Sequence, residues 1–201
     1  MTTMPRVPAS LDAETERALG RHARTAYRLL GIRDFGRLDF RVTADGRVFF
    51  IEANALPSLE PEAGIYAAAK EAGVGGLDAV LAAIVESADR RQRLRGDRRR
   101  PRRPGRGLKV GFAYNEKSAA AKGSGSDAEA EFDSPSTLDS IRTAIASFGH
   151  EVIDLEATPD LPGRLAVADV DLVFNIAEGL RGRYRESQVP ALLELMNIPY
   201  T

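Results

Sequence analysis

Residues 37–58 decide the fold of the first part of the chain. They read Arg-Leu-Asp-Phe-Arg-Val-Thr-Ala-Asp-Gly-Arg-Val-Phe-Phe-Ile-Glu-Ala-Asn-Ala-Leu-Pro-Ser. Two runs rich in β-branched and aromatic residues flank Asp45-Gly46, the strongest short signal for a β-hairpin. If these two residues form the turn, Asp39 lies directly opposite Glu52, and if the loop has four residues the two lie on a diagonal. Both registers make the two carboxylates cross-strand neighbours.

Side chains alternate along each strand, so the predicted hairpin has an apolar and a polar face. The apolar face, expected to be core, carries Leu38, Phe40 and Val42 with Phe49, Ile51 and Ala53. The polar face carries Arg37, Asp39, Glu52 and Asn54. Facing carboxylates repel unless a cation lies between them, and two carboxylates with an amide oxygen suit Mg²⁺ or Mn²⁺. The alternative is a solvated face on which Arg37 pairs with Asp39 or Glu52.

The composition is that of an ordinary globular protein. The chain has 201 residues, of which 43% are hydrophobic and 28% charged, and its formal net charge is -1. This charge balance implies no polyanionic partner for the whole chain. The absence of cysteine excludes disulfides and thiolate metal sites. We see no signal peptide and no apolar run long enough for a bilayer, so we expect a cytoplasmic protein without a membrane partner.

Around the hairpin the sequence predicts three helices and then a linker. The first helix begins at Ser10 or Asp12 and runs to about Leu30, and the other two span about 62–72 and 77–88. The segment 90–107 is crowded with arginine, proline and glycine, so it cannot form a core and is predicted to be a linker. Binding of nucleic acid there is disfavoured because the segment offers no aromatic residue to stack on bases.

A second α/β unit is predicted from Leu108 onward. Strands are expected at 108–114, 152–155, 171–176 and from Ile198, with helices at 134–148 and 188–196. This β-α-β-β-α-β order argues for a parallel sheet with right-handed crossovers. The predicted domains are therefore 1–89, a linker at 90–107, and 108–201.

The first ninety residues resemble the metal-binding, C-terminal lobe of the ATP-grasp fold, in the version found in the D-alanine–D-alanine ligase family. The resemblance lies in Arg37, Asp39 and Glu52-Ala53-Asn54, with Pro57 shortly after. It implies that Asp39, Glu52 and Asn54 are metal ligands, the last two also holding the cofactor ATP through Mg²⁺ or Mn²⁺. It also implies that Arg37 binds a carboxylate or steadies a tetrahedral intermediate.

The match departs from the family at Ser58, where the family usually has glycine after this proline. The backbone N–H of Ser58 would still contribute to an oxyanion hole, but the serine side chain narrows the site and disfavours a positive φ.

The second half resembles the N-terminal substrate domain of the same family, a Rossmann-like pre-ATP-grasp domain. The similarity is carried by Lys109-Val110-Gly111, by 149–152 and above all by 192–201. It implies that Glu131 or Asp133 lies where the amino group of the first amino-acid substrate binds, although a solvent-exposed acid is the alternative for both. Glu178-Gly179 stands where the family has a His-Gly turn, which makes Glu178 a third candidate for substrate binding.

The order of the two halves is unusual for such a ligase. Metal lobe, linker and truncated substrate domain follow one another, as at the junction of two tandem modules, and no central nucleotide lobe is recognised. The resemblance implies part of an ATP-dependent carboxylate–amine ligase that joins amino acids through an acyl phosphate, as in peptidoglycan precursor synthesis. We expect this isolated chain to be inactive without the central lobe of a parent protein. The alternative function is that of a non-catalytic, degenerate relative that acts as a binding module.

Overall fold

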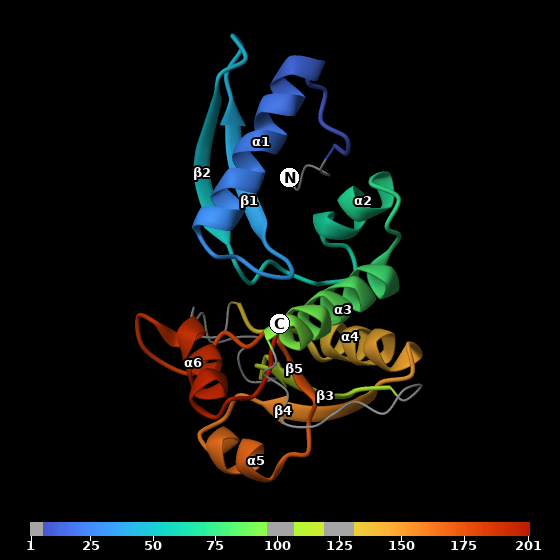
Figure 1. Cartoon of the computed structure of the whole chain (residues 1–201), viewed down its shortest axis with the longest axis vertical. Helices are drawn as coiled ribbons and strands as arrows, with labels where there is room; N and C mark the ends of the chain where they lie inside the picture. Colours follow the sequence, from blue (N-terminus) through green and yellow to red (C-terminus); the bar gives the residue numbers. More distant parts are fainter. Residues whose placement is uncertain (1–5, 96–106, 119–130) are drawn as a thin grey trace. The chain divides into compact units, whose positions relative to one another are not determined.

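The computed structural model describes residues 6–95, 107–118 and 131–201, and it divides into two compact units, 1–75 and 76–201 (Figure 1). The first unit contains an antiparallel hairpin with helices, and the second contains a three-stranded parallel sheet with helices. The architecture is therefore α/β, as predicted. Within the described ranges, no helix combines the length and the apolar character that crossing a bilayer requires.

In the first unit, helix α1 (Ala13–Leu29) packs along the hairpin of β1 (Arg37–Val42) and β2 (Val48–Asn54), as Figure 1 shows. Asp12 caps α1, because its carboxylate accepts the N–H groups of Glu14 and Thr15 at 3.0 and 2.9 Å. A short helix, α2 (Gly64–Glu71), follows the hairpin. The predicted helices at these places are confirmed to within a few residues.

The hairpin reaches its register through a loop and a bulge that the sequence analysis did not anticipate. Thr43 and Arg47 close the loop, and Gly46 adopts φ +80° within it, as in three-residue hairpin loops whose last residue is left-handed. The register then shifts between Asp39 and Phe40, so that Ile51 has no partner in β1. The bulge restores the pairing in which Asp39 lies directly opposite Glu52.

The predicted apolar face of the hairpin was wrong in part, and the bulge is the reason. Phe40 pairs with Phe50, their ring centroids 5.5 Å apart, and Val42 pairs with Val48. Phe49 lies opposite Arg41 instead. Side chains alternate between the two faces of a strand. One extra residue in β2 therefore moves the side chains on one side of it to the opposite face of the hairpin. The side chains of Phe49, Phe50 and Ile51 are about half exposed.

The second unit begins with helix α3 (Leu77–Arg95), which continues past its predicted end at residue 88. Arginine is a good helix former, and Arg91 is anchored, since its guanidinium donates to the carbonyl oxygen of Tyr200 at 2.6 Å. The apolar face of α3 is buried and packs against α4 (Pro135–Ser147). The beginning of the predicted linker is thus helical, and its residues 96–106 lie outside the described ranges. The predicted domain limits stay a prediction.

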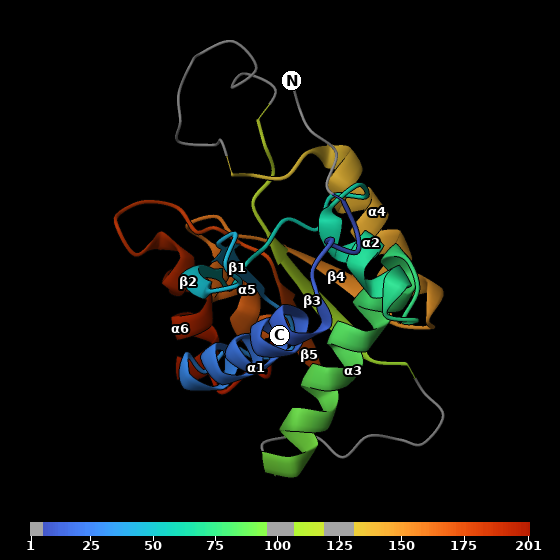
Figure 2. The same ribbon diagram turned by 90° about the horizontal axis from the view of Figure 1, so that it is seen from above.

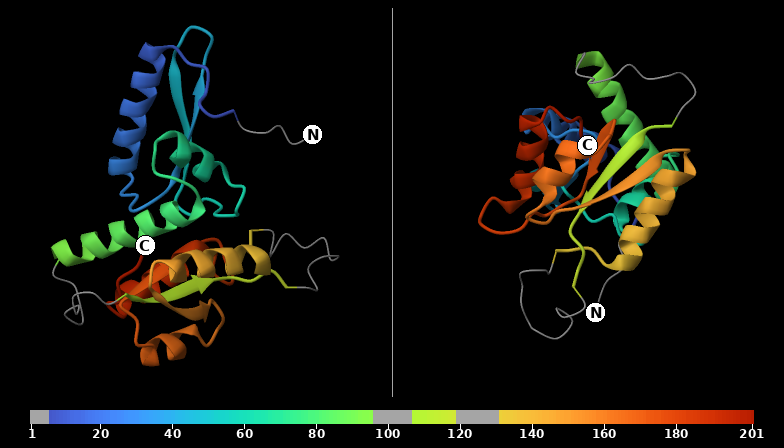
Figure 3. Two further views of the ribbon diagram at one scale, coloured as in Figure 1. Left: turned by 90° about the vertical axis from the view of Figure 1, so that its right-hand side faces the viewer. Right: turned by 90° about the horizontal axis from the view of Figure 1, so that it is seen from below.

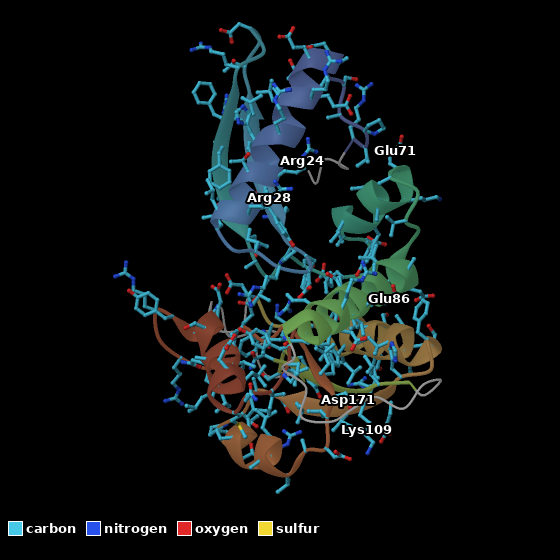
Figure 4. The ribbon with its side chains drawn as sticks, viewed as in Figure 1. Arg24, Arg28, Glu71, Glu86, Lys109 and Asp171 are labelled. Atoms are coloured by element: carbon cyan, nitrogen blue, oxygen red, sulfur yellow. The ribbon has the colours of Figure 1, made fainter. Side chains whose placement is uncertain are left out.

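The parallel sheet of the second unit has the strand order β4-β3-β5, with β3 (Lys109–Tyr114) in the centre (Figure 2). Strands β4 (Glu151–Glu156) and β5 (Leu172–Asn175) flank it. Asp171 accepts the N–H of Lys109 at 2.8 Å, which ties the starts of β5 and β3 together (Figure 4). The predicted parallel sheet is confirmed, although Tyr200 forms only an isolated bridge to Val173 where a further strand was expected.

Helices cover both faces of this sheet, with α4 on one and α5 (Leu161–Val167) on the other (Figure 3). Phe112 and Phe174 fill the core on one face, and Leu165 and Leu193, from α5 and α6 (Gln188–Leu195), fill it on the other. Helix α5 was missed because it is short and begins with Leu-Pro-Gly, which is typical of a turn. Proline is nevertheless well accommodated in the first turn of a helix.

The loop after β5 depends on Gly179. Its φ is +78°, its N–H donates to the side-chain oxygen of Asn115 at 2.9 Å, and a Cβ there would stand 2.1 Å from the carbonyl oxygen of Arg185. Because Asn115 follows β3 directly, this bond joins the carboxyl ends of two neighbouring strands.

We expect Gly179→Ala to lower the free energy of unfolding by at least about 2 kcal/mol, because the left-handed conformation is costly and the carbonyl must move. Gly163→Ala is the matched control, since it lies inside α5 and a Cβ there meets no atom within 4 Å. Urea unfolding followed by circular dichroism measures both. Equal midpoints for the two variants would contradict this account of the loop.

Candidate functional site

The polar face of the hairpin brings three of the predicted residues together. The Nε of Arg37 lies 3.1 and 3.3 Å from the two carboxylate oxygens of Asp39, and a terminal nitrogen of the same guanidinium lies 3.9 Å from Oε1 of Glu52. The side chains are 53, 39 and 62% exposed. Both carboxylates are therefore within reach of one cationic group at the surface of the hairpin.

Asn54 ends β2 on the same face, opposite Arg37. Its side-chain oxygen accepts the N–H of Leu56 at 2.8 Å, which turns the chain as it leaves the strand. A carbonyl oxygen has two lone pairs, so this hydrogen bond leaves capacity for a second partner.

The loop that carries Ser58 is held between two buried residues, Pro57 and Leu59. The buried Tyr66 of α2 donates its hydroxyl to the carbonyl oxygen of Leu59 at 2.7 Å, and the hydroxyl of Ser58 accepts the N–H of Glu60 at 3.2 Å. Across the described residues, no acceptor takes the backbone N–H of Ser58.

A pocket of about 550 Å³ lies within the first unit and contains both predicted catalytic residues in its wall. Its lining is otherwise small and apolar apart from one carboxylate, and it comprises Gly36, Arg37, Leu38, Pro57, Ser58, Glu60, Ala63, Gly64, Ile65 and Ala68. An arginine and a serine among mostly apolar residues suit a small ligand that carries an anionic group.

The donor set on the hairpin fits a hard divalent cation. Two carboxylates face each other across the strands and an amide oxygen lies on the same face, and oxygen ligands are what Mg²⁺ and Mn²⁺ prefer. A search of the described residues finds no group of three or more His, Cys, Asp and Glu that could hold a metal. A metal held here would therefore complete its shell with the amide, with water or with a ligand's oxygens.

The other predicted substrate residues gather in the second unit, at the carboxyl end of its sheet. Glu131 forms an ion pair with Arg185, and the backbone of Asp133 is hydrogen-bonded to that of Asn115. Burial raises the pKa of Glu178 to about 7, and the negative charges of Glu131 and Glu186 act in the same direction. Glu131 and Asp133 thus both act electrostatically on Glu178, and their role in substrate binding stays a prediction.

Sequence reasoning passed over two residues that organise this acidic cluster. Asn115 is 4% exposed and donates to the carbonyl oxygen of Ala157 while accepting from Gly179. Arg185 supplies the positive charge opposite Glu131. The position of Asn115 immediately after a buried strand is the signal that could have indicated it, since ligands of parallel sheets bind beyond the carboxyl ends of the strands.

Comparison with known proteins finds a similarity in the first part of the chain. Residues 1–86 match the family model described as D-ala D-ala ligase C-terminus, and the rest of the chain is unassigned. This model includes the whole hairpin and Ser58.

Individual relatives are similar over the same part of the chain. The D-alanine–D-alanine ligase of Pseudomonas fluorescens (strain Pf0-1) is 37% identical over 87 residues, which are 43% of this chain and 27% of that ligase. The D-alanine–D-alanine ligase of Burkholderia orbicola (strain MC0-3) is 37% identical over 75 residues, which are 37% of this chain and 24% of that ligase. The chain thus spans about a quarter of the length of these relatives. No solved structure matches the chain.

The raised pKa of Glu178 predicts a pH-dependent stability. Between its ordinary value of 4.5 and about 7, the folded chain binds more protons at this carboxyl than the unfolded chain does. The free energy of unfolding therefore falls as pH rises through this window and is level above it. Glu178→Gln mimics the protonated form and should remove this fall.

We expect Glu178→Gln to be more stable than the parent at pH 8 by roughly 1 kcal/mol, after discounting for solvent screening, and equal to it near pH 4.5. Urea unfolding at several pH values measures the difference. Glu151→Gln is the control, because Glu151 is an exposed residue at the other end of the sheet. The same pH profile in parent and Glu178→Gln would show that Glu178 is not buried against its neighbours.

Proposed function

We propose that residues 1–86 are the metal-binding lobe of an ATP-dependent carboxylate–amine ligase that joins amino acids. The observation that carries the proposal is the pair Asp39 and Glu52, which face each other across the hairpin within reach of a single cationic group. The similarity of residues 1–86 to the D-ala D-ala ligase C-terminus supports it independently.

In this function Asp39, Glu52 and Asn54 would hold the divalent cation. A cation held by these residues would supply positive charge that offsets the negative charge of the ATP phosphates. The hairpin holds these residues in fixed positions, because they lie on one face of two paired strands and not on a free loop. Asn54 contributes in addition through its bond to Leu56, which sets the direction of the chain toward Ser58.

The pocket would receive the amino-acid substrates. The guanidinium of Arg37 can form two parallel hydrogen bonds with a carboxylate, and the N–H of Ser58 can stabilise negative charge that develops on an oxygen. Both residues line the same pocket. Its volume of about 550 Å³ lies within the range typical of pockets for small ligands.

For the second unit, we propose a Rossmann-like domain whose acidic cluster binds the amino group of a substrate. Glu131, Asp133 and Glu178 supply negative charge at the carboxyl end of a parallel sheet, which is where such folds bind their ligands. Burial and the neighbouring acids raise the pKa of Glu178, and a bound ammonium group would add a positive charge beside it, so binding of an amine should lower this pKa.

The metal site is tested directly by Mn²⁺ binding to residues 1–201, measured from the loss of the free-ion signal in electron paramagnetic resonance. Asp39→Asn and Glu52→Gln should each weaken binding by about 2 kcal/mol, or about thirtyfold. Each substitution removes the attraction between the divalent ion and one negative charge at contact distance. Asp45→Asn, an exposed and ion-paired carboxylate in the hairpin loop, is the matched control. Unchanged Mn²⁺ binding in both site variants would contradict the proposed metal site and favour a non-catalytic binding module.

We expect residues 1–201 alone to show no phosphate release that depends on added amino acids. Phosphoryl transfer requires a nucleotide held in line and shielded from water, and no part of the chain is assigned to a nucleotide-holding lobe. The assay combines the purified chain, Mg²⁺-ATP and D-alanine or other amino acids. Release at the rate of ordinary enzymes would mean that this chain builds an ATP site by itself.

A further inference from the structure

Arg37 occupies the position between two carboxylates that a divalent cation would need. Its Nε contacts both oxygens of Asp39, and its terminal nitrogen approaches Glu52 from the same side. The oxygens that would bind a metal are thus already engaged by a cation that belongs to the chain. A guanidinium and a divalent ion repel each other, so the presence of one at these oxygens weakens the binding of the other.

We propose that Arg37 is a built-in competitor of the divalent cation, which must displace this guanidinium from Asp39 and Glu52 in order to bind. The proposal rests on the proposed function, since it concerns the same two carboxylates. Displacement is feasible because all three side chains are exposed, and exposed ion pairs contribute little to stability.

The pocket gives the displaced guanidinium a second place. Arg37 already lines it together with Ser58, so the side chain can leave the carboxylates without moving its backbone out of β1. Arrival of the cation would therefore free Arg37 for an anionic ligand in the pocket. Coupling between two sites is reciprocal. The factor by which a bound cation tightens binding of the anion is therefore also the factor by which the anion tightens binding of the cation.

Arg41 offers a matched control on the same strand. It lies two residues after Asp39, as Arg37 lies two residues before it, and alternation places all three on one side of β1. Arg41 is exposed and forms no ion pair with any residue that the structure describes. Removing Arg41 deletes the same charge near Asp39 without deleting the contact.

The test measures Mn²⁺ binding to the full chain of residues 1–201. Arg37→Ala should tighten binding by about twofold to fivefold, the value of an exposed ion pair, whereas Arg41→Ala should change it less. In the parent, titration with Mg²⁺ should shift the Nε–H resonance of Arg37, identified by its loss in Arg37→Ala. This shift should saturate together with cation binding and be absent in Asp39→Asn.

The outcomes separate this inference from the function on which it rests. If the parent binds Mn²⁺ and Asp39→Asn does not, but Arg37→Ala and Arg41→Ala bind it equally well, the proposed competition by Arg37 is overturned. The proposed metal site then stands. A Nε–H resonance unmoved by bound Mg²⁺ would overturn it in the same way. If neither the parent nor Arg37→Ala binds Mn²⁺, the metal site and the competitor are both wrong.

Discussion

Electrostatic repulsion between Asp39 and Glu52 is the constraint on which the candidate site depends. Two carboxylates that face each other on adjacent strands are unfavourable unless a positive charge lies beside both. In this structure the positive charge comes from Arg37, at 3.1 Å from one carboxylate and 3.9 Å from the other. The same requirement is what makes the pair suited to a divalent cation, so the ion pairs of Arg37 and the proposed chemistry have one physical origin.

The second unit deals with the same repulsion in a different way. The pKa of Glu178 is raised because this carboxyl is partly buried and lies near the negative charges of Glu131 and Glu186. The positive charge of Arg185 offsets only part of this rise. On the exposed hairpin, Arg37 lies beside both acids. Within the loop after β5, desolvation favours the protonated acid. The two acidic groups therefore differ in exposure: the carboxylates of the hairpin face solvent, whereas Glu178 is partly buried.

Much of the fold could be predicted because it depends on local chemistry. Asp12 caps α1, Ser134 and Pro135 begin α4, and the dense apolar run before Asn175 forms a buried parallel strand. Asp39 and Glu52 were also predicted to share a face, but the structure reaches this pairing through the bulge and not through alternation alone. Helix α5 was not predicted, because a proline and a glycine in its first turn resemble a turn at the level of sequence.

The sequence by itself determined the elements of the hairpin and the parallel sheet of the second unit, because these follow from hydrophobic patterning and from crossover geometry. Only the tertiary structure decided how the register is reached, through the bulge at Ile51. It also decided that Arg37 and Ser58 line one pocket and that Arg91 extends α3 by its bond to Tyr200. Such contacts join residues far apart in the chain, and no local propensity encodes the distance between them.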